Sequence, residues 1–379
     1  MSKAVGVGKT GNKWYYVITV GYDESGKQKQ KKQRGFNTKK EAMEARTKAL
    51  NEVMSGTYIE PTKTLYGDFL KDWLESKKVS VKRQTLDNYK IIIRTHVAPT
   101  LGHIPLSKLT ALDLQQFINK LQEEGHSGAY MRKIYSVVSE SLRKAERWNL
   151  ISRNPAERVD PPRINKKDIT VWNTEEIAMF LNSTREEELQ IAFVLAITTG
   201  MRQGEILGLR WSDIDLDNKV LYIRQTLSHD GKELMSGGKT KSSVRSVMLP
   251  EKSLTALRKH RGTIREKKVA QGRNFQENDL VICTKFGTPV TPRNLMRTFY
   301  RVMKEAKVPK IRFHDLRHTH ATLLLMQNVN PKIVADRLGH ANVRLTLDTY
   351  SHLLPSMQRE AVQEIEKVFA DMKQYAIAI

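Results

Sequence analysis

The side chains best suited to chemistry on a phosphate lie in the second half of the 379-residue chain. Gly200 should end one helix and place Arg202 at the start of the next, where free amides favour an anion. Glu205 follows one turn later and can hold the Arg202 guanidinium in place. Further on, His314 and Arg317 are three residues apart and share a helix face. The full set of candidates comprises Arg202, His314, Arg317, His340 and Tyr350.

These residue types match what the cleavage of a phosphodiester requires. The transition state spreads negative charge over the non-bridging oxygens, and fixed guanidinium groups stabilise that charge without reorganising. A tyrosine hydroxyl can attack the phosphorus and form a covalent intermediate, and phenolate leaves well enough for the bond to be reversed. A lysine or histidine can pass a proton to the departing 5′ oxygen. Neither a metal ion nor a cofactor is then required.

Two other chemistries fit the sequence less well. Residues 6–10 read GVGKT, like the end of a phosphate-binding loop, but the first glycine of that motif and the strand before it are missing. A flexible basic terminus is the better interpretation. His314 and His318 have a spacing that could share a metal ion, yet the Arg317 cation lies between them. We therefore expect no metal site.

The composition narrows the choice of partner. Lys and Arg outnumber Asp and Glu by 64 to 41, which gives a formal net charge of +23. This surplus disfavours a self-contained metabolic enzyme and indicates a polyanionic partner, either nucleic acid or an anionic membrane surface. The apolar runs are far shorter than the roughly 20 residues of a membrane helix. The N-terminus has no apolar signal region, and the single cysteine, Cys283, excludes a disulfide framework. The remaining candidates are cytoplasmic DNA- or RNA-binding proteins and enzymes.

Changes in composition divide the chain into three segments, which must position these groups. Residues 1–59 contain two extended stretches, from Trp14 to Val20 and from Lys27 to Phe36, followed by a helix that Thr38 and Glu41 begin with a capping-box spacing. Lys and Arg outnumber Asp and Glu by 12 to 5 in this segment. We expect a small α+β domain whose basic face contacts DNA. Lysines that protect an edge strand are the alternative.

Helical patterns dominate the second segment, residues 60–163. One helix should start after Thr110, with Asp113 completing its cap, and stop at Gly125. Another should run from Tyr130 to Trp148. The short connections between these patterns indicate a compact all-α bundle.

The third segment, residues 164–379, follows a pair of prolines that bar helix continuation. Helical patterns flank an extended region at residues 220–249, so we expect a mixed, mainly α domain with a small β-sheet. Beyond Pro355 the apolar residues recur at the spacing of an amphipathic helix, and they are Met357, Val362, Ile365, Val368, Phe369 and Met372.

Together the motifs resemble those of the tyrosine recombinase (phage integrase) family, in the same order and with similar spacing. They are TGMRQGE with Arg202, HDLRHTHAT with His314 and Arg317, LGHAN with His340, and TLDTYSH with Tyr350. The stretch GKTKSSVR at residues 238–245 is similar to the family's β-hairpin, whose catalytic lysine would be Lys239, with Lys241 as the alternative. The first two segments resemble the arm-site and core-site DNA-binding domains of phage and conjugative-transposon integrases.

This resemblance implies a role for each residue. Tyr350 would attack the scissile phosphate and form a 3′-phosphotyrosine. Lys239 would protonate the 5′ oxygen, and His314 would assist proton transfer from the tyrosine. The residues that would bind the phosphate oxygens are Arg202, Arg317 and His340. Glu205 and Asp315 would hold these groups in place without contacting the phosphate.

The resemblance also implies the partners. They would be double-stranded DNA with core and arm attachment sites, a homotetramer assembled on that DNA, an excisionase and a host DNA-bending protein, and no membrane. The tail helix would contact a neighbouring subunit or pack on its own domain. The leading hypothesis is a recombinase that needs neither metal nor ATP. A DNA-binding architectural or regulatory protein that has lost turnover is the alternative; a relaxing topoisomerase suits the two N-terminal segments less well.

Overall fold

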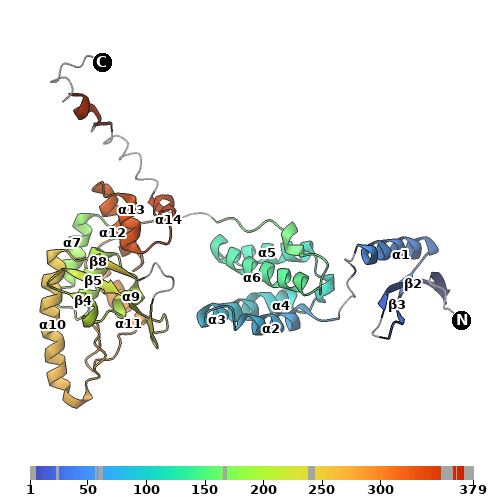
Figure 1. Cartoon of the computed structure of the whole chain (residues 1–379), viewed down its shortest axis with the longest axis horizontal. Helices are drawn as coiled ribbons and strands as arrows, with labels where there is room; N and C mark the ends of the chain where they lie inside the picture. Colours follow the sequence, from blue (N-terminus) through green and yellow to red (C-terminus); the bar gives the residue numbers. More distant parts are fainter. Residues whose placement is uncertain are drawn as a thin grey trace. The chain divides into compact units, whose positions relative to one another are not determined.

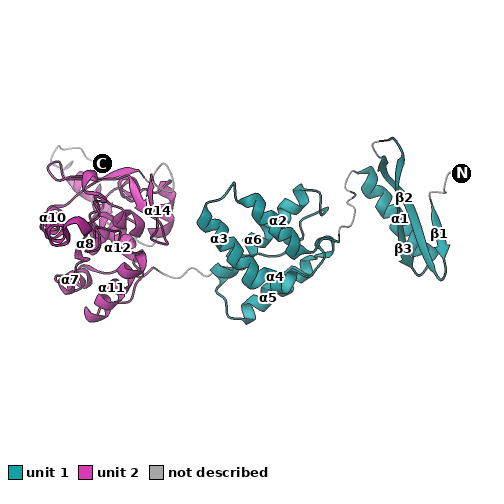
Figure 2. Ribbon diagram, turned by 90° about the horizontal axis from the view of Figure 1, so that it is seen from below, with its two compact units in different colours: residues 1–167 teal, residues 168–379 magenta. Residues whose placement is uncertain are grey.

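The computed structural model describes residues 6–22, 25–55, 58, 63–164, 169–237, 244–350, 362–363 and 365–370. The chain divides into two compact units, Met1–Lys167 and Asp168–Ile379 (Figures 1 and 2). The first unit holds a small sheet with one helix and, after it, a group of helices. The second is mainly helical with short strands. The expected fold class is therefore confirmed. No helix within the described ranges is both long and apolar enough to cross a membrane.

The N-terminal sheet has three antiparallel strands in the order β1 (Val7–Thr10), β2 (Lys13–Tyr22) and β3 (Gln28–Phe36). Helix α1 (Lys39–Met54) packs on one face of this sheet, where Ile18 is fully buried. The helix begins as expected, because the Thr38 side chain accepts a hydrogen bond from the Glu41 amide at 3.1 Å. The Glu41 carboxylate reaches one residue further back than in a full capping box and accepts from the Asn37 amide at 3.0 Å.

The expectation of a flexible basic terminus at residues 6–10 is wrong for most of that stretch. Val7–Thr10 form strand β1, whose register on β2 pairs Val7 with Tyr16 and Thr10 with Lys13. The turn between the strands includes Gly11, which has a φ of 62°. Glycine adopts this left-handed conformation without steric cost, so the chain can turn back on itself and pair its backbone amides and carbonyls.

The second part of the first unit is all helical, as expected. The Thr110–Asp113 capping box is confirmed, and the second predicted helix starts two residues earlier than expected, because Ser127 caps it. The core of this helical part includes the buried aromatic residues Tyr66, Phe69, Trp73 and Phe117. The elements are α2 (Tyr66–Lys77), α3 (Arg83–Ile92), the π-helical turn η1 (Ile93–Val97), α4 (Ala98–Leu101), η2 (Leu106–Lys108), α5 (Ala111–Glu123), α6 (Gly128–Arg147) and η3 (Pro155–Arg158).

At the centre of the second unit lies helix α8 (Gln190–Thr199), most of whose side chains are buried. The strands form two small antiparallel sheets, β4-β5-β8 and β6-β7. The helices are α7 (Thr174–Ser183), α8 (Gln190–Thr199), α9 (Gln203–Leu207), η4 (Trp211–Asp213), α10 (Glu251–Gln271), η6 (Gly272–Asn274), α11 (Pro292–Glu305), α12 (Asp315–Met326), α13 (Pro331–Leu338) and α14 (Val343–Tyr350). The strands are β4 (Ile214–Asp215), β5 (Val220–Ile223), β6 (Gln225–Leu227), β7 (Leu234–Ser236) and β8 (Arg245–Met248).

Two apolar clusters in this unit position its polar residues. The larger one includes Phe180, Phe193 and Phe299, and it fixes α8 against its neighbours. The smaller one joins α12, α13 and α14, and the Tyr350 ring belongs to it. Of the expected tail helix, residues 362–363 and 365–370 are helical, and the apolar side chains there are exposed. Met357 and Met372 of the same pattern lie outside the described residues.

Candidate active site

Arg202 stands where the sequence placed it, in the turn between α8 and α9. Gly200 ends α8 with a φ of 65°, and Arg202 is the N-cap residue of α9. Its Nη1 donates to Glu205 Oε1 at 2.8 Å, and its backbone amide donates to Glu205 Oε2 at 2.8 Å. The Glu205 carboxylate therefore fixes both the side chain and the backbone of Arg202. The Arg202 side chain stays 39% exposed, so an incoming anion can reach it.

A second arginine completes this arrangement from strand β8. Arg245 donates from Nη1 and Nη2 to the two oxygens of Glu205 at 3.1 and 3.0 Å, and from Nε to the Arg337 carbonyl at 2.8 Å. Burial alone would raise the pKa of Glu205, but hydrogen bonds and charge from Arg245 and Arg202 hold it below its ordinary value. The carboxylate is therefore ionised at neutral pH and is shared by two guanidiniums.

Arg317 lies on α12 and is only 3% exposed. Its Nη1 donates to the Gly200 carbonyl at 2.7 Å, and its Nη2 donates to the Leu338 carbonyl at 2.6 Å. Arg202 Nη2 donates to the next carbonyl, that of Gly339, at 3.3 Å. Adjacent carbonyls at the C-terminal end of α13 thus hold both guanidiniums, where the partial negative charge of a helix end favours cations. Burial and then the nearby Arg202 and Arg245 lower the pKa of Arg317 to about 9.

Two of the predicted histidines face these cations. Burial, followed by the charges of His318, Arg317 and Arg202, lowers the pKa of His314 to about 4. Burial and the charges of Arg317 and Arg202 have the same effect on His340, whose pKa is also about 4. The His340 ring is oriented by a hydrogen bond between its Nδ1 and Thr346 Oγ1, which lie 2.7 Å apart. Both imidazoles are therefore neutral at neutral pH, and each has one N–H group that can donate a hydrogen bond to an anion.

Tyr350 ends helix α14 and is 3% exposed. Its hydroxyl lies 2.8 Å from Nδ1 of His318 on α12. Burial is the main reason that the pKa of Tyr350 is raised, and the charge of Arg317 opposes this shift. The phenol therefore stays protonated, next to a histidine and within the field of the arginine.

The remaining predicted residues have different surroundings. Asp315 caps the first turn of α12 and binds Arg312, with a distance of 2.7 Å from Arg312 Nη2 to Asp315 Oδ1. The charge of Asp315 also opposes the lowering of the pKa of His314. Lys239 and its alternative Lys241 lie outside the described residues. The structure thus brings together six predicted residues, which are Arg202, Glu205, His314, Arg317, His340 and Tyr350.

Three further residues join this cluster, and sequence reasoning gave none of them a role in it. Arg245 is the last residue of the GKTKSSVR stretch, and His318 follows Arg317 directly. Arg337 donates to His320 Nε2 at 3.1 Å and to the Thr198 carbonyl at 3.0 Å, which ties α13 to α8. The position of His318 four residues after His314 is visible in the sequence, but this spacing by itself suggests a shared metal ion and gives no sign of a contact with Tyr350.

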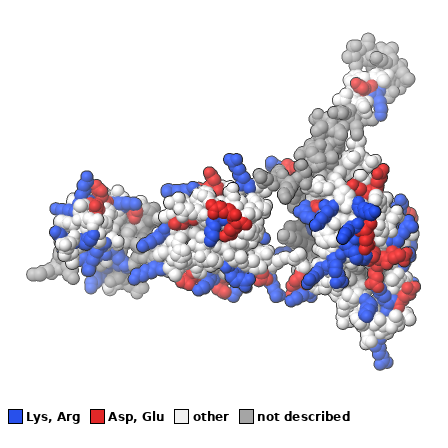
Figure 3. All heavy atoms as spheres, turned by 180° about the vertical axis from the view of Figure 1, so that it is seen from behind, with Lys and Arg blue, Asp and Glu red and all other residues white. Residues whose placement is uncertain are grey.

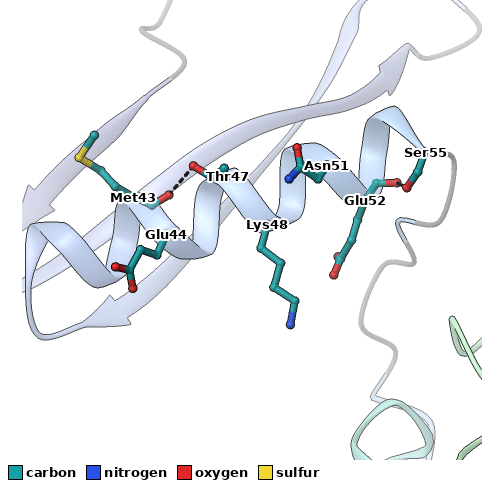
Figure 4. A pocket seen from close by; sticks show the side chains of 7 residues that line it. All are labelled: Met43, Glu44, Thr47, Lys48, Asn51, Glu52 and Ser55. Carbon is teal, nitrogen blue, oxygen red and sulfur yellow. Dashed lines mark hydrogen bonds between the residues drawn. The ribbon is translucent and has the colours of Figure 1, made fainter.

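Two other places in the described residues were candidates for a ligand. In the first unit, possible metal-ligand atoms lie close together on His96, Glu124 and His126. However, His96 already forms a hydrogen bond with Tyr130 at 3.1 Å, and His126 pairs with Glu124 at 3.3 Å. A shallow depression follows the exposed side of α1 (Figure 4). Its Thr47 hydroxyl bonds the carbonyl of Met43 in the same helix at 3.1 Å. Neither place adds to the phosphate chemistry of the cluster.

Three protein-family models match the chain in succession. The arm DNA-binding domain matches residues 6–53. The N-terminal SAM-like domain of phage integrases matches residues 65–122. The phage integrase family itself matches residues 167–357, a stretch that contains the whole cluster.

Curated relatives match over nearly the full length. A "Tyrosine recombinase XerC-like" protein of Caldanaerobacter subterraneus is 30% identical over 97% of this chain and 100% of its own length. The "ICEBs1 integrase" of Bacillus subtilis is 27% identical over 95% of this chain and 99% of its own.

Solved structures share the fold. The Tn1549 transposon integrase in complex with a circular intermediate DNA has a TM-score of 0.66 at 19% identity and covers 78% of this chain and 99% of its own. A lambda integrase tetramer bound to a Holliday junction has a TM-score of 0.56 at 19% identity and covers 88% of this chain and 92% of its own. From the family match and the full-length relatives together, we conclude that this chain belongs to the phage integrase family and is a site-specific DNA recombinase.

Proposed function

We propose that this recombinase cuts and rejoins DNA through a covalent bond between Tyr350 and the 3′ phosphate, and thereby integrates or excises a prophage or mobile element. One observation carries the proposal. Arg202 and Arg245 share the buried carboxylate of Glu205, and Arg317 lies within the field of all three, so the described residues of the cluster have an excess of fixed positive charge. A phosphodiester supplies the missing negative charge, and the Tyr350 phenol lies within the field of Arg317.

The residues divide the work as follows. Arg202 and Arg317 bind the non-bridging oxygens, where they stabilise the charge that develops in the transition state. His340 donates a hydrogen bond to the same phosphate, with its ring oriented by Thr346. Lys239 protonates the departing 5′ oxygen. Neutral His314 takes part in proton transfer beside the phosphate.

Glu205 and Asp315 support these residues without touching the substrate. Glu205 holds Arg202 in place, and Asp315 secures the first turn of α12 through Arg312. Among the described members of the predicted set, each has a partner or a neighbour in the cluster, which favours an active enzyme over a protein that has kept the fold and lost turnover.

The N-terminal sheet is the proposed binding surface for arm-type DNA. On the face away from α1, β2 and β3 pair Tyr15 with Arg34 and Val17 with Lys32. The Lys32 ammonium lies 3.5 Å from the centroid of the Tyr15 ring. A β-ribbon fits the major groove, and cations beside aromatic rings suit a phosphate backbone. Lys and Arg side chains are also spread over the visible faces of both units (Figure 3).

We further propose three domains: residues 1–59 for arm sites, 60–163 for core sites and 164–379 for catalysis. The three family matches at 6–53, 65–122 and 167–357 fall within these limits. The partners would be double-stranded DNA carrying core and arm sites, other copies of the chain in a tetramer on that DNA, an excisionase and a host DNA-bending protein. The protein would act in the bacterial cytoplasm.

A suicide substrate tests the central claim. A duplex attachment site, nicked near the cleavage position so that the cut end diffuses away, should trap the wild-type protein on the 3′ end. Tyr350→Phe should bind the same DNA and give no adduct. If the wild type gives none, or Tyr350→Phe gives as much, the assignment of the nucleophile is wrong.

A truncation tests the division of labour between the domains. Deletion of residues 1–59 should leave core-site cleavage intact and abolish integration at sites that depend on arm DNA. Full integration by the truncated protein would remove the arm-binding proposal.

A further inference from the structure

The Tyr350 hydroxyl has one hydrogen-bond partner among the described residues, and that partner is His318 rather than His314. The distance from Tyr350 Oη to His318 Nδ1 is 2.8 Å. We infer that His318 holds the Tyr350 hydroxyl and takes up its proton when the oxygen attacks the DNA phosphate. This inference rests on the proposed function, because it assumes that Tyr350 is the nucleophile.

The direction of this hydrogen bond follows from the surroundings. The Tyr350 side chain is buried, so its hydroxyl hydrogen needs an acceptor within the protein. Among the described residues, the one hydrogen-bond partner of this hydroxyl is Nδ1 of His318, which must therefore be the acceptor. The phenol therefore donates and Nδ1 accepts, which places the imidazole hydrogen on Nε2. In this tautomer Nδ1 carries the lone pair that a proton acceptor needs.

The elements around His318 supply charges of both signs. Asp315 and Arg317 lie on the same helix, Arg312 precedes it, and Tyr350 comes from α14. Burial is the main reason that the pKa of His318 is lowered, and Arg312 and Arg317 add to the effect while Asp315 opposes it.

Two further imidazoles face His318. The His314 ring meets it edge to face, with centroids 5.2 Å apart, and His340 is close enough for its pKa to be affected by the charge of His318. With this surplus of cations, the imidazolium form is disfavoured until a phosphate adds negative charge. Proton uptake is thereby coupled to the arrival of the substrate.

The step balances as a simple displacement at phosphorus. The Tyr350 Oη–P bond forms, and the bond from phosphorus to the 5′ oxygen breaks. The phenol proton passes to His318 Nδ1, while the 5′ oxygen receives a separate proton from the general acid on the opposite side. Rejoining reverses both transfers, so the imidazolium returns its proton to the departing phenolate.

His314 is less suited to this role. No hydrogen bond joins it to Tyr350 in the described part of the chain, and its contact with His318 is through the rings. After burial and the charge of His318, the charges of Arg317 and Arg202 help to lower the pKa of His314. His314 thus belongs with the groups that meet the phosphate, and His318 with the nucleophile.

Two substitutions separate holding the hydroxyl from taking up its proton. His318→Ala removes both functions. His318→Asn places an amide oxygen near the position of Nδ1, where it can accept the phenol hydrogen but cannot bind a proton near neutral pH. His260→Gln is the matched control, because it perturbs another internal imidazole, which bonds the Val281 carbonyl at 2.7 Å outside the cluster. Thermal melts and DNA binding verify that each variant is folded.

The rate of adduct formation on the nicked attachment-site duplex is measured between about pH 6 and about pH 9, so that rates at and above neutrality can be compared. General-base catalysis contributes roughly 10²- to 10⁴-fold, so His318→Ala should be at least about 100-fold slower than wild type at neutral pH. Without a base the reaction requires tyrosinate, so the His318→Asn rate should rise about tenfold per pH unit above neutrality, where the wild-type rate is level. His260→Gln should follow the wild type.

A second substrate locates the defect. A 5′-bridging phosphorothiolate has a thiolate leaving group that needs no proton. It should rescue Lys239→Ala and leave both His318 variants slow. Rescue of the His318 variants would overturn the inference, and so would a wild-type rate for His318→Ala or a wild-type pH profile for His318→Asn. Those results would leave the proposed function intact as long as Tyr350→Phe forms no adduct, whereas an adduct with Tyr350→Phe would refute the proposed function itself.

Discussion

Replacing the buried carboxylate of Glu205 should damage both the stability of the second unit and the rate of cleavage. Glu205 is 5% exposed and accepts four hydrogen bonds from Arg202 and Arg245, between 2.8 and 3.1 Å. Glu205→Gln keeps the shape but turns one acceptor into a donor that faces a guanidinium. It also removes the negative charge of Glu205 from beside Arg245, whose side chain is only 7% exposed.

The magnitude follows from these contacts. Hydrogen bonds to charged groups contribute about 1.5–3 kcal/mol each, and breaking a buried ion pair costs about 3–5 kcal/mol. Because Arg202 is partly exposed, its contribution is discounted, and a loss of about 3 kcal/mol is expected, mostly from Arg245. For a unit of this size that lowers the melting temperature by about 6–12 °C. Loss of one fixed transition-state donor slows the reaction by about 10²- to 10³-fold.

Asp213 provides a matched control in the same unit. It is 2% exposed and also lies between two arginines, with Arg210 Nε at 2.7 Å and Arg224 Nη1 at 3.4 Å, but neither arginine belongs to the phosphate cluster. Asp213→Asn should therefore lower the melting temperature to a similar extent and leave adduct formation unchanged below the melting transition. Thermal unfolding and suicide-substrate cleavage at 20–25 °C measure the two effects. Equal cleavage rates for the two folded variants would refute the claim that Glu205 acts by placing Arg202.

Other substitutions and conditions test the rest of the cluster. Arg317→Lys replaces a planar guanidinium, whose two Nη atoms reach the Gly200 and Leu338 carbonyls, with a compact ammonium that lacks this spread geometry, so adduct formation should fall by at least about 100-fold. Near-normal suicide cleavage would count against bidentate anchoring. Thr346→Val removes the partner of His340 Nδ1, and the loss of one hydrogen bond of about 1 kcal/mol should slow adduct formation about fivefold; an unchanged rate would show that the ring is oriented by other contacts. His314, His320 and His340 have pKa values of about 4, lowered by burial from 6.5. The unfolded chain binds protons at these positions first, so their contribution to stability is complete above pH 6.5 and decreases as the pH falls toward 4. Urea unfolding at pH 7 and at pH 5 should show this loss, and equal stability at both would contradict the buried neutral state.

Much of the fold could be predicted because the signals are local. Thr38 and Thr110 cap their helices as the sequence indicated, since a hydroxyl three residues before an acidic side chain satisfies free amides without help from the rest of the chain. Gly200 ends α8 in the left-handed conformation for the same kind of reason. Strand β1 was missed because a four-residue strand acquires its hydrogen bonds only from a partner, which local patterning does not show.

The residue types of the site and their order could be read from the sequence, because motif spacing fixes neighbours on one helix, such as His314 and Arg317. The packing of the folded chain was needed to show that Arg202 and Arg317 donate to the adjacent carbonyls of Gly339 and Leu338, and that the Tyr350 hydroxyl bonds His318. These contacts join residues that are 137, 21 and 32 positions apart in the chain. They exist because apolar packing of α8, α12, α13 and α14 brings the helix ends together, and hydrogen bonds at that range depend on the packing rather than on any local pattern.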